Sequence, residues 1–241
     1  WAKKNVDHTG SVWRLYGRRR RNKNPNIDKE YRLRKKARLM DKASPDSSKK
    51  YTWNFFYWGP LLCKIKIHSE DLKECVKLCS KKSSSVSDTL AGVIKHEHYV
   101  SSIKYDKILQ LYYPSFRKCY EQWYGTPLLK KIKMTMSWVN FMVAGEFNPP
   151  HLHKDCDFSS VLFTKVPEKL EEEHKKFDGS GGGPGSIAFT YGEFQPYSLC
   201  GKNFRPQAGD FFIFPSTLIH FVAPFMSPGE RISISANFKL E

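Results

Sequence analysis

The chain has 241 residues, of which 40% are apolar and 15% aromatic, and it carries a formal net charge of +16. This much apolar material can bury a real core, which excludes a wholly disordered chain. No run of about 18 apolar residues could span a bilayer, and the six cysteines form no CxxC pair, which disfavours a zinc ribbon or a disulfide-stapled secreted fold. The composition predicts an intracellular protein of a reducing compartment, with cytoplasm, organelle interior and virion all compatible.

The positive charge is concentrated at the N-terminus. Residues 1–50 hold 17 Lys and Arg against 5 Asp and Glu, so +12 of the net charge lies there. Like charges this dense predict a basic extended arm that becomes ordered on an anionic partner, namely nucleic acid or a nucleoprotein assembly; a solvated tail or a targeting remnant is the alternative. The residues expected to contact phosphates are Arg18, Arg19, Arg20, Arg21, Arg32, Arg34, Lys35, Lys36 and Arg38.

Residues 51–127 are expected to support the core that follows. The segment 51–67 is typical of a bent strand pair, since its second half alternates apolar residues with lysines. Ser69 is expected to cap a helix with apolar residues at helical spacing. Cys75 and Cys79 would then share one buried face, as packing residues rather than redox partners.

A second helical stretch is predicted over residues 104–124. Pro114 is expected to kink or split it, because proline lacks the backbone donor that a helix interior needs, and Gly125 marks its end. From residue 128 to 241 the chain turns to strands, and we expect this part to form the functional core.

The strands of this core are predicted from period-two alternation. They cover residues 128–141, 158–166, 186–191, 210–214 and 231–239. The segment 172–185 is rich in glycine and charge, but no Lys-Ser or Lys-Thr follows the glycines, so it is predicted to be a flexible loop and not a phosphate cradle. In the last strand, period two places four polar residues on one face: Arg231, Ser233, Ser235 and Asn237.

Two histidines follow a predicted strand in the run Gly145-Glu-Phe-Asn-Pro-Pro-His151-Leu-His153. Side chains i and i+2 of an extended backbone project to the same side, so His151 and His153 can reach one metal ion at roughly 2.0–2.1 Å. The third ligand is predicted to be His220, which follows an apolar strand that turns at Pro215. Two strands distant in sequence must then meet, and a β-barrel brings them together. His96 and His98 have the same spacing but no matching third residue, so we interpret them as a pair without a ligand role.

This layout resembles the cupin pattern, in which Gly, five residues, His-x-His and an acid are followed by Gly, five residues, Pro and a later His. The matching residues are Gly145, His151, His153, Asp157, Gly209, Pro215 and His220. The sequence departs from the pattern at Asp157, where Glu is usual, and at Thr217, where Gly is usual. The resemblance implies an α+β fold, with a double-stranded β-helix (jelly-roll or cupin-like) barrel, helices packed outside it, and Asp157 as a possible fourth ligand.

A second resemblance rests on Trp138-Val-Asn140, on the two-histidine run, on Ser159-Ser-Val-Leu-Phe163 and on Glu230-Arg231-Ile-Ser-Ile-Ser-Ala-Asn237. These runs look like the 2-oxoglutarate–Fe(II) oxygenases common in marine phages, over roughly residues 53–240. The resemblance implies Fe(II) and 2-oxoglutarate as cofactors. It also implies that Arg231 and Ser233, which follow the distal histidine at the family's spacing, bind the remote carboxylate of 2-oxoglutarate. A planar guanidinium suits such a bidentate contact, and Asn140 is expected to line the same pocket.

The metal ligands depart from the usual oxygenase pattern, because His153 stands where His-x-Asp has its acid. Either three histidines bind the metal, with Asp157 as a possible fourth ligand, or the ligands are His153, Asp155 and His220. The spacing from Gly145 to the first histidine favours three histidines. Such a site lacks the anionic ligand that helps to balance the charge of Fe(II).

The function predicted first is that of a non-haem Fe(II), 2-oxoglutarate-dependent hydroxylase acting on a protein or nucleic-acid substrate. One alternative is a non-catalytic ribonucleoprotein or virion component that keeps the barrel and anchors through its basic arm. Another is a cupin-type metal protein that never uses 2-oxoglutarate. Arg231 separates the first from the last, because it faces the metal cavity in an oxygenase and forms a surface salt bridge in the cupin alternative.

Overall fold

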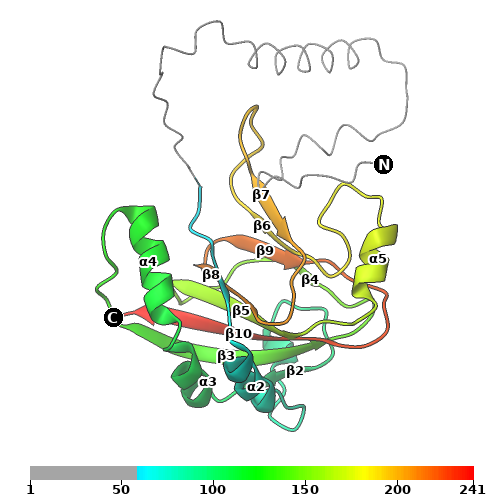
Figure 1. Cartoon of the computed structure of the whole chain (residues 1–241), viewed down its shortest axis with the longest axis horizontal. Coiled ribbons are helices and arrows are strands. Elements are labelled where there is room, and N and C mark those ends of the chain that lie inside the picture. The colour runs from blue at the N-terminus through cyan, green and yellow to red at the C-terminus, as the bar shows by residue number, and fades with distance from the viewer. Residues whose placement is uncertain (1–58) are drawn as a thin grey trace, which may run out of the picture. The chain divides into compact units, whose positions relative to one another are not determined.

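The computed structural model describes residues 59–241, which form one compact unit (Figure 1). The predicted basic arm at residues 1–50, with its expected phosphate-binding arginines and lysines, and the first half of the predicted strand pair lie outside the described residues. Residues 59–241 contain no helix with the length and apolar character needed to cross a membrane.

Helices and short strands precede a strand-rich second half. The helices are α2 (Ser69–Leu78), α3 (Ser102–Leu109), α4 (Tyr113–Tyr124) and α5 (Leu170–Lys176), with a 3-10 turn at Ser87–Thr89. The strands are β1 (Cys63–Lys66), β2 (Glu97–Tyr99), β3 (Ile132–Met142), β4 (Asn148–His151), β5 (Phe158–Lys165), β6 (Ile187–Thr190), β7 (Gly201–Phe204), β8 (Asp210–Pro215), β9 (Ile219–Val222) and β10 (Arg231–Leu240).

The strands form two antiparallel sheets. The larger has the order β1-β8-β5-β10-β3-β2, and the smaller has the order β4-β9-β6-β7. This agrees with the expected jelly-roll arrangement, but no strand of one sheet pairs with a strand of the other within residues 59–241, so the two sheets do not close into a barrel. The physical reason is that apolar side chains of both sheets, such as Phe163, Phe189 and Phe214, fill the space between them and join the sheets face to face.

Helices cover the other face of the larger sheet (Figure 1). Side chains such as Cys75 of α2, Leu109 of α3 and Phe116 of α4 share one core with the apolar side chains of β10. This agrees with the prediction of helices outside the sheets. The segment 51–127 also supplies β1 and β2, which are the edge strands of the larger sheet.

The long predicted helix is split, as Pro114 indicated. Helix α4 begins at Tyr113, so Pro114 lies in its first turn, where a missing N–H leaves no intrahelical bond unmade. Gly125 ends the helix with a φ of 71°, a left-handed conformation that favours glycine.

Ser69 does not cap helix α2. The cap position belongs to His68, and no side chain makes the capping hydrogen bond. Cys75 is buried in this helix and Cys79, the residue that follows it, is partly buried; both are free thiols. Burial raises the pKa of Cys75 to about 12 and that of Cys79 to about 11, which suits packing residues.

Part of the predicted loop at 172–185 is helical. Helix α5 carries mostly charged residues, and its buried residues are Leu170 and His174, which are one turn apart. Because only two positions of this charged segment are buried, and one of them is a histidine, the sequence shows no helical spacing of apolar residues. The short strands β2, β4, β7 and β9 were missed for a related reason, since each has only three or four residues.

Candidate metal centre and adjoining cavity

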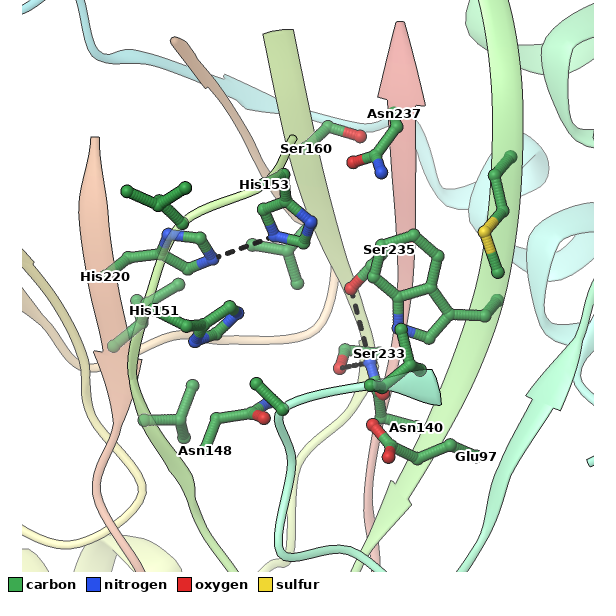
Figure 2. A pocket seen from close by; sticks show the side chains of 18 of the residues that line it. Glu97, Asn140, Asn148, His151, His153, Ser160, His220, Ser233, Ser235 and Asn237 are labelled. Atoms are coloured by element: carbon green, nitrogen blue, oxygen red, sulfur yellow. Dashed lines mark hydrogen bonds between the residues drawn. The ribbon is translucent and has the colours of Figure 1, made fainter. Parts of the chain in front are cut away.

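Three histidines converge where β4 meets β9 (Figure 2). His151 of β4 and His220 of β9 are directly opposite partners in the antiparallel pair. His153 follows β4 by two residues, and its backbone N–H donates to the carbonyl of Ser216 at 2.9 Å, which holds the segment against the turn before β9. The strand pairing therefore brings together the three residues that the sequence placed at one metal ion.

The nitrogen atoms of these histidines suit a divalent metal ion. One ring nitrogen from each lies within 4.8 Å of the others, and the Nε2 atoms of His153 and His220 are 3.3 Å apart. Two nitrogens bound to one ion at roughly 2.0–2.1 Å would be about 3 Å apart. Nδ1 of His151 lies 2.7 Å from the carbonyl of Pro149, and Nδ1 of His220 lies 3.0 Å from that of Leu218. When each Nδ1–H donates to its carbonyl, Nε2 keeps its lone pair for the metal.

The surroundings keep these imidazoles neutral. Burial lowers the pKa of His153 to about 4 and that of His220 to about 3, and proximity to other imidazoles adds to both shifts. The pKa of His151 is also lowered by burial. Neutral imidazole is the form that binds a metal, so the site is prepared for one at neutral pH.

The two candidate acids do not join this group. Asp157, the expected fourth ligand, accepts a hydrogen bond from the backbone N–H of Leu240 at 2.7 Å. Asp155 is exposed on a turn with a positive φ of 59°. Within residues 59–241, these three histidines are the only group of His, Cys, Asp or Glu side chains close enough together to hold a metal ion.

A cavity of about 360 Å³ opens beside the histidines. The polar face of β10 lines it, so period two correctly placed Arg231, Ser233, Ser235 and Asn237 on one face. The alternate residues, such as Ile234 and Phe238, belong to the core under the helices. Strand β10 therefore separates the core from the cavity.

Arg231 lies in the wall of this cavity and not on the surface. Its side chain is only 1% exposed. One guanidinium nitrogen donates to the carbonyl of Gly185 at 3.1 Å, another lies 2.9 Å from the sulfur of Met142, and the group sits 5.2 Å from the centre of the Phe163 ring. Its Nε has no partner, and no carboxylate of the described residues pairs with it.

A buried cation without an anion is costly, and burial accordingly lowers the pKa of Arg231. A carboxylate entering the cavity would supply the missing negative charge. The residues present therefore fit a carboxylate-bearing co-substrate beside a metal ion.

Trp138 of β3 also lines the cavity, and so does Asn140, as expected from the sequence. The Asn140 amide donates to the hydroxyls of Ser233 at 3.4 Å and Ser235 at 3.2 Å. The Trp138 ring lies 5.7 Å from the His153 ring, so β3 connects the polar face of β10 with the metal site.

Sequence reasoning missed Glu97 and Asn148, which line the same cavity. Glu97 lies between two histidines that we interpreted as a pair without a ligand role, and neither histidine belongs to the three-histidine group. What places Glu97 at the cavity is its pairing with Asn140 across β2 and β3, for which a three-residue strand gives no local signal.

Residues 136–237 match the protein family described as "Putative 2OG-Fe(II) oxygenase". This stretch of the chain matches a 2OG-Fe(II) oxygenase domain. The match is less than half of the 241 residues, but it includes the three histidines, Asn140, Arg231 and Ser233. The family is one of 2-oxoglutarate-dependent oxygenases, with Fe(II) and 2-oxoglutarate as its cofactors.

Solved structures resemble the oxygenase domain in fold. A Pseudomonas putida prolyl-4-hydroxylase is 15% identical, with a TM-score of 0.50, over 76% of this chain and 94% of that one. A 2OG-Fe(II) oxygenase family oxidoreductase from Burkholderia pseudomallei is 15% identical, with a TM-score of 0.47, over 74% and 84%. No curated protein sequence matches the chain. The marine-phage subgroup is not among these findings.

Proposed function

We propose that this protein is a non-haem Fe(II), 2-oxoglutarate-dependent hydroxylase in which three histidines hold the iron and Arg231 binds the co-substrate. The observation that carries the proposal is the buried Arg231 guanidinium, which has no carboxylate partner among the described residues and lines the same cavity as His151, His153 and His220. This location also argues against a cupin-type protein, in which Arg231 would form a surface salt bridge.

The side chains have separate tasks in this proposal. Fe(II) and 2-oxoglutarate together supply the dioxygen-dependent hydroxylation of a C–H bond. The histidines present neutral Nε2 atoms to the metal. Arg231 binds the remote carboxylate of 2-oxoglutarate, with Ser233 on the same face of β10 as a further donor. Apolar cavity residues such as Val161 and Phe214 exclude water, which strengthens the charged contacts inside.

We propose three histidines as the complete set of protein ligands. Asp157 already accepts a backbone hydrogen bond elsewhere, and Asp155 is exposed. Three neutral ligands do not balance the positive charge of the ion. The anionic co-substrate therefore contributes more of the balancing negative charge than it would at a site with a carboxylate ligand.

The proposed substrate is a residue of a protein or of a nucleic acid. The +12 charge of residues 1–50 supports a partner that contains phosphate, and it also supports the alternative of a non-catalytic component anchored in a nucleoprotein assembly. Removing residues 1–50 should weaken nucleic-acid binding and leave the fold of residues 59–241 intact. Circular dichroism and a binding assay at two salt concentrations would test both expectations.

Anaerobic titration of the metal-free protein with Fe(II), followed by 2-oxoglutarate, tests the enzyme. We expect a visible metal-to-ligand charge-transfer band that is lost in His220→Ala and strongly weakened in Arg231→Ala. Metal binding without a band would favour the cupin-type alternative. Absence of metal binding would leave a non-catalytic domain, and the hydroxylase proposal would then be wrong.

A further inference from the structure

Glu97 is a buried carboxylate that the proposed hydroxylase chemistry does not use. It lies on β2, is 1% exposed and lines the cavity, yet its Oε2 has no hydrogen-bond partner. Arg231 and Lys154 are the basic residues that line the same cavity, and neither forms an ion pair with it. Burial raises the pKa of Glu97 to about 7, and the nearby Glu146 adds to the shift. This carboxylate therefore lacks both a cation and a sufficient set of donors.

A second unpartnered acceptor lies beside it. Asn140 is the direct cross-strand partner of Glu97, and facing side chains in such a pair have Cβ atoms about 4.5–5.5 Å apart. The amide nitrogen of Asn140 is occupied by Ser233 and Ser235, whereas its buried Oδ1 has no partner. In Figure 2 the Glu97 carboxylate and the Asn140 amide lie on one wall of the pocket. Glu97 and Asn140 therefore present two unpartnered acceptor atoms on this wall.

Gly92 packs closely against the Glu97 carboxylate. A Cβ added to Gly92 would lie 2.7 Å from the Asn148 side-chain oxygen and 2.9 Å from Oε1 of Glu97. The backbone at Gly92 thus packs closely against the carboxylate and the Asn148 amide. A residue with a side chain at position 92 would therefore clash with both groups.

We infer that Glu97 and Asn140 bind a cationic nitrogen group of the substrate, an ammonium or a guanidinium, inside the oxygenase cavity. The inference rests on the proposed function and names the substrate class of that site. A cation with two or more N–H groups can donate to both acceptors at once and supply the charge that Glu97 lacks. Arg231 binds the carboxylate of the co-substrate in this proposal. The cavity therefore has a cationic contact for the co-substrate and an anionic contact, Glu97, for the substrate. Asn140 lies within the residues that match the family, whereas Glu97 lies outside them.

The first test measures binding of small probes to the full chain loaded anaerobically with Fe(II) and 2-oxoglutarate. The probes are n-butylammonium, n-butylguanidinium, n-butanol and butyrate, and binding is followed by NMR. We expect the two cations to bind at least about tenfold more tightly than butanol or butyrate, which corresponds to the loss of a charged hydrogen bond. Equal binding of butanol would overturn the inference.

The second test uses Glu97→Gln, which keeps the shape of the side chain and can donate to Asn140. We expect it to weaken cation binding about tenfold or more, while the dissociation constant of 2-oxoglutarate changes less than about twofold. The matched control is Glu70→Gln on the exposed face of α2, which should leave both constants unchanged. A structural role for Glu97 predicts equal cation binding in the variant and in the parent protein.

A direct readout is the NMR signal of the Glu97 side-chain carboxyl carbon. Its pKa should fall when n-butylammonium binds and stay unchanged with butanol. If the Asn140 amide is reversed, so that its nitrogen donates to Glu97, the carboxylate is satisfied internally, neither probe shifts the signal, and the inference is wrong. The two proposals fail in different ways. If the hydroxylase proposal is wrong, the charge-transfer band is missing, but binding of the cationic probes can still be measured.

Discussion

His151 and His220 face each other across β4 and β9, with ring centroids 4.2 Å apart. A register shift of one residue would turn one of them away, so the metal site depends on this pairing. His220→Ala should reduce the affinity for Fe(II) or Co(II) by more than about 100-fold, since loss of a ligand costs more than loss of a hydrogen bond that orients one. Optical titration with Co(II) measures the affinity. His96→Ala is the matched control, and an equal loss there would contradict the assignment.

Arg231→Met should remove co-substrate binding without unfolding the protein. The substitution deletes a buried cation that has no carboxylate partner, so the free energy of unfolding without ligand should stay within about 1 kcal/mol of the parent or increase. In the parent, 2-oxoglutarate in the presence of metal should raise the denaturant midpoint, and in Arg231→Met it should not. Urea titrations with and without 2-oxoglutarate measure both. Stabilisation by 2-oxoglutarate in the variant would show that the carboxylate binds elsewhere.

The metal-free protein should lose stability as the pH falls below 6.5. The folded-state pKa values of His153 and His220 lie near 4 and 3, whereas both histidines take up protons near 6.5 once unfolded. The unfolded state therefore binds more protons between pH 6.5 and about 4, and each histidine contributes a loss of up to about 1.4 kcal/mol per pH unit. Urea denaturation in the presence of a chelator at pH 7, 6 and 5 measures the slope. His153→Asn should flatten it, and a slope equal to that of the parent would show that His153 titrates normally.

Asp157→Asn should leave metal affinity within about twofold of the parent value but lower the free energy of unfolding by about 1 kcal/mol, because the Asp157 carboxylate accepts the N–H of Leu240. Co(II) titration and urea denaturation separate the two effects. A large loss of metal affinity would instead make Asp157 a ligand, as the cupin resemblance implied.

The metal site and the co-substrate contact could be predicted because their signals are local. Two histidines two residues apart and the alternation along β10 each place side chains on one face, and a family resemblance connects them. The Glu97 contact could not be predicted this way. It depends on a three-residue strand that pairs with β3 although the two are about forty residues apart in the sequence. Neither the hydrophobic pattern of this strand nor the turns beside it predict the pairing.

The jelly-roll arrangement of sheets was predicted, but the absence of barrel closure was not, for a related physical reason. Alternation predicts that each strand has an apolar face, but it does not say whether the edges of a sheet meet. Here apolar packing between the sheets takes the place of hydrogen-bonded closure.

Strand β10 is hydrogen-bonded on both sides, to β5 and to β3. A one-residue insertion or deletion within it would exchange its two faces, placing Arg231 and the serines in the apolar core and the isoleucines in the cavity. One such change would remove the co-substrate contact and the packing against the helices together. Length changes should therefore be absent from this strand among functional relatives, while single substitutions on its cavity face could alter ligand preference without disturbing the core.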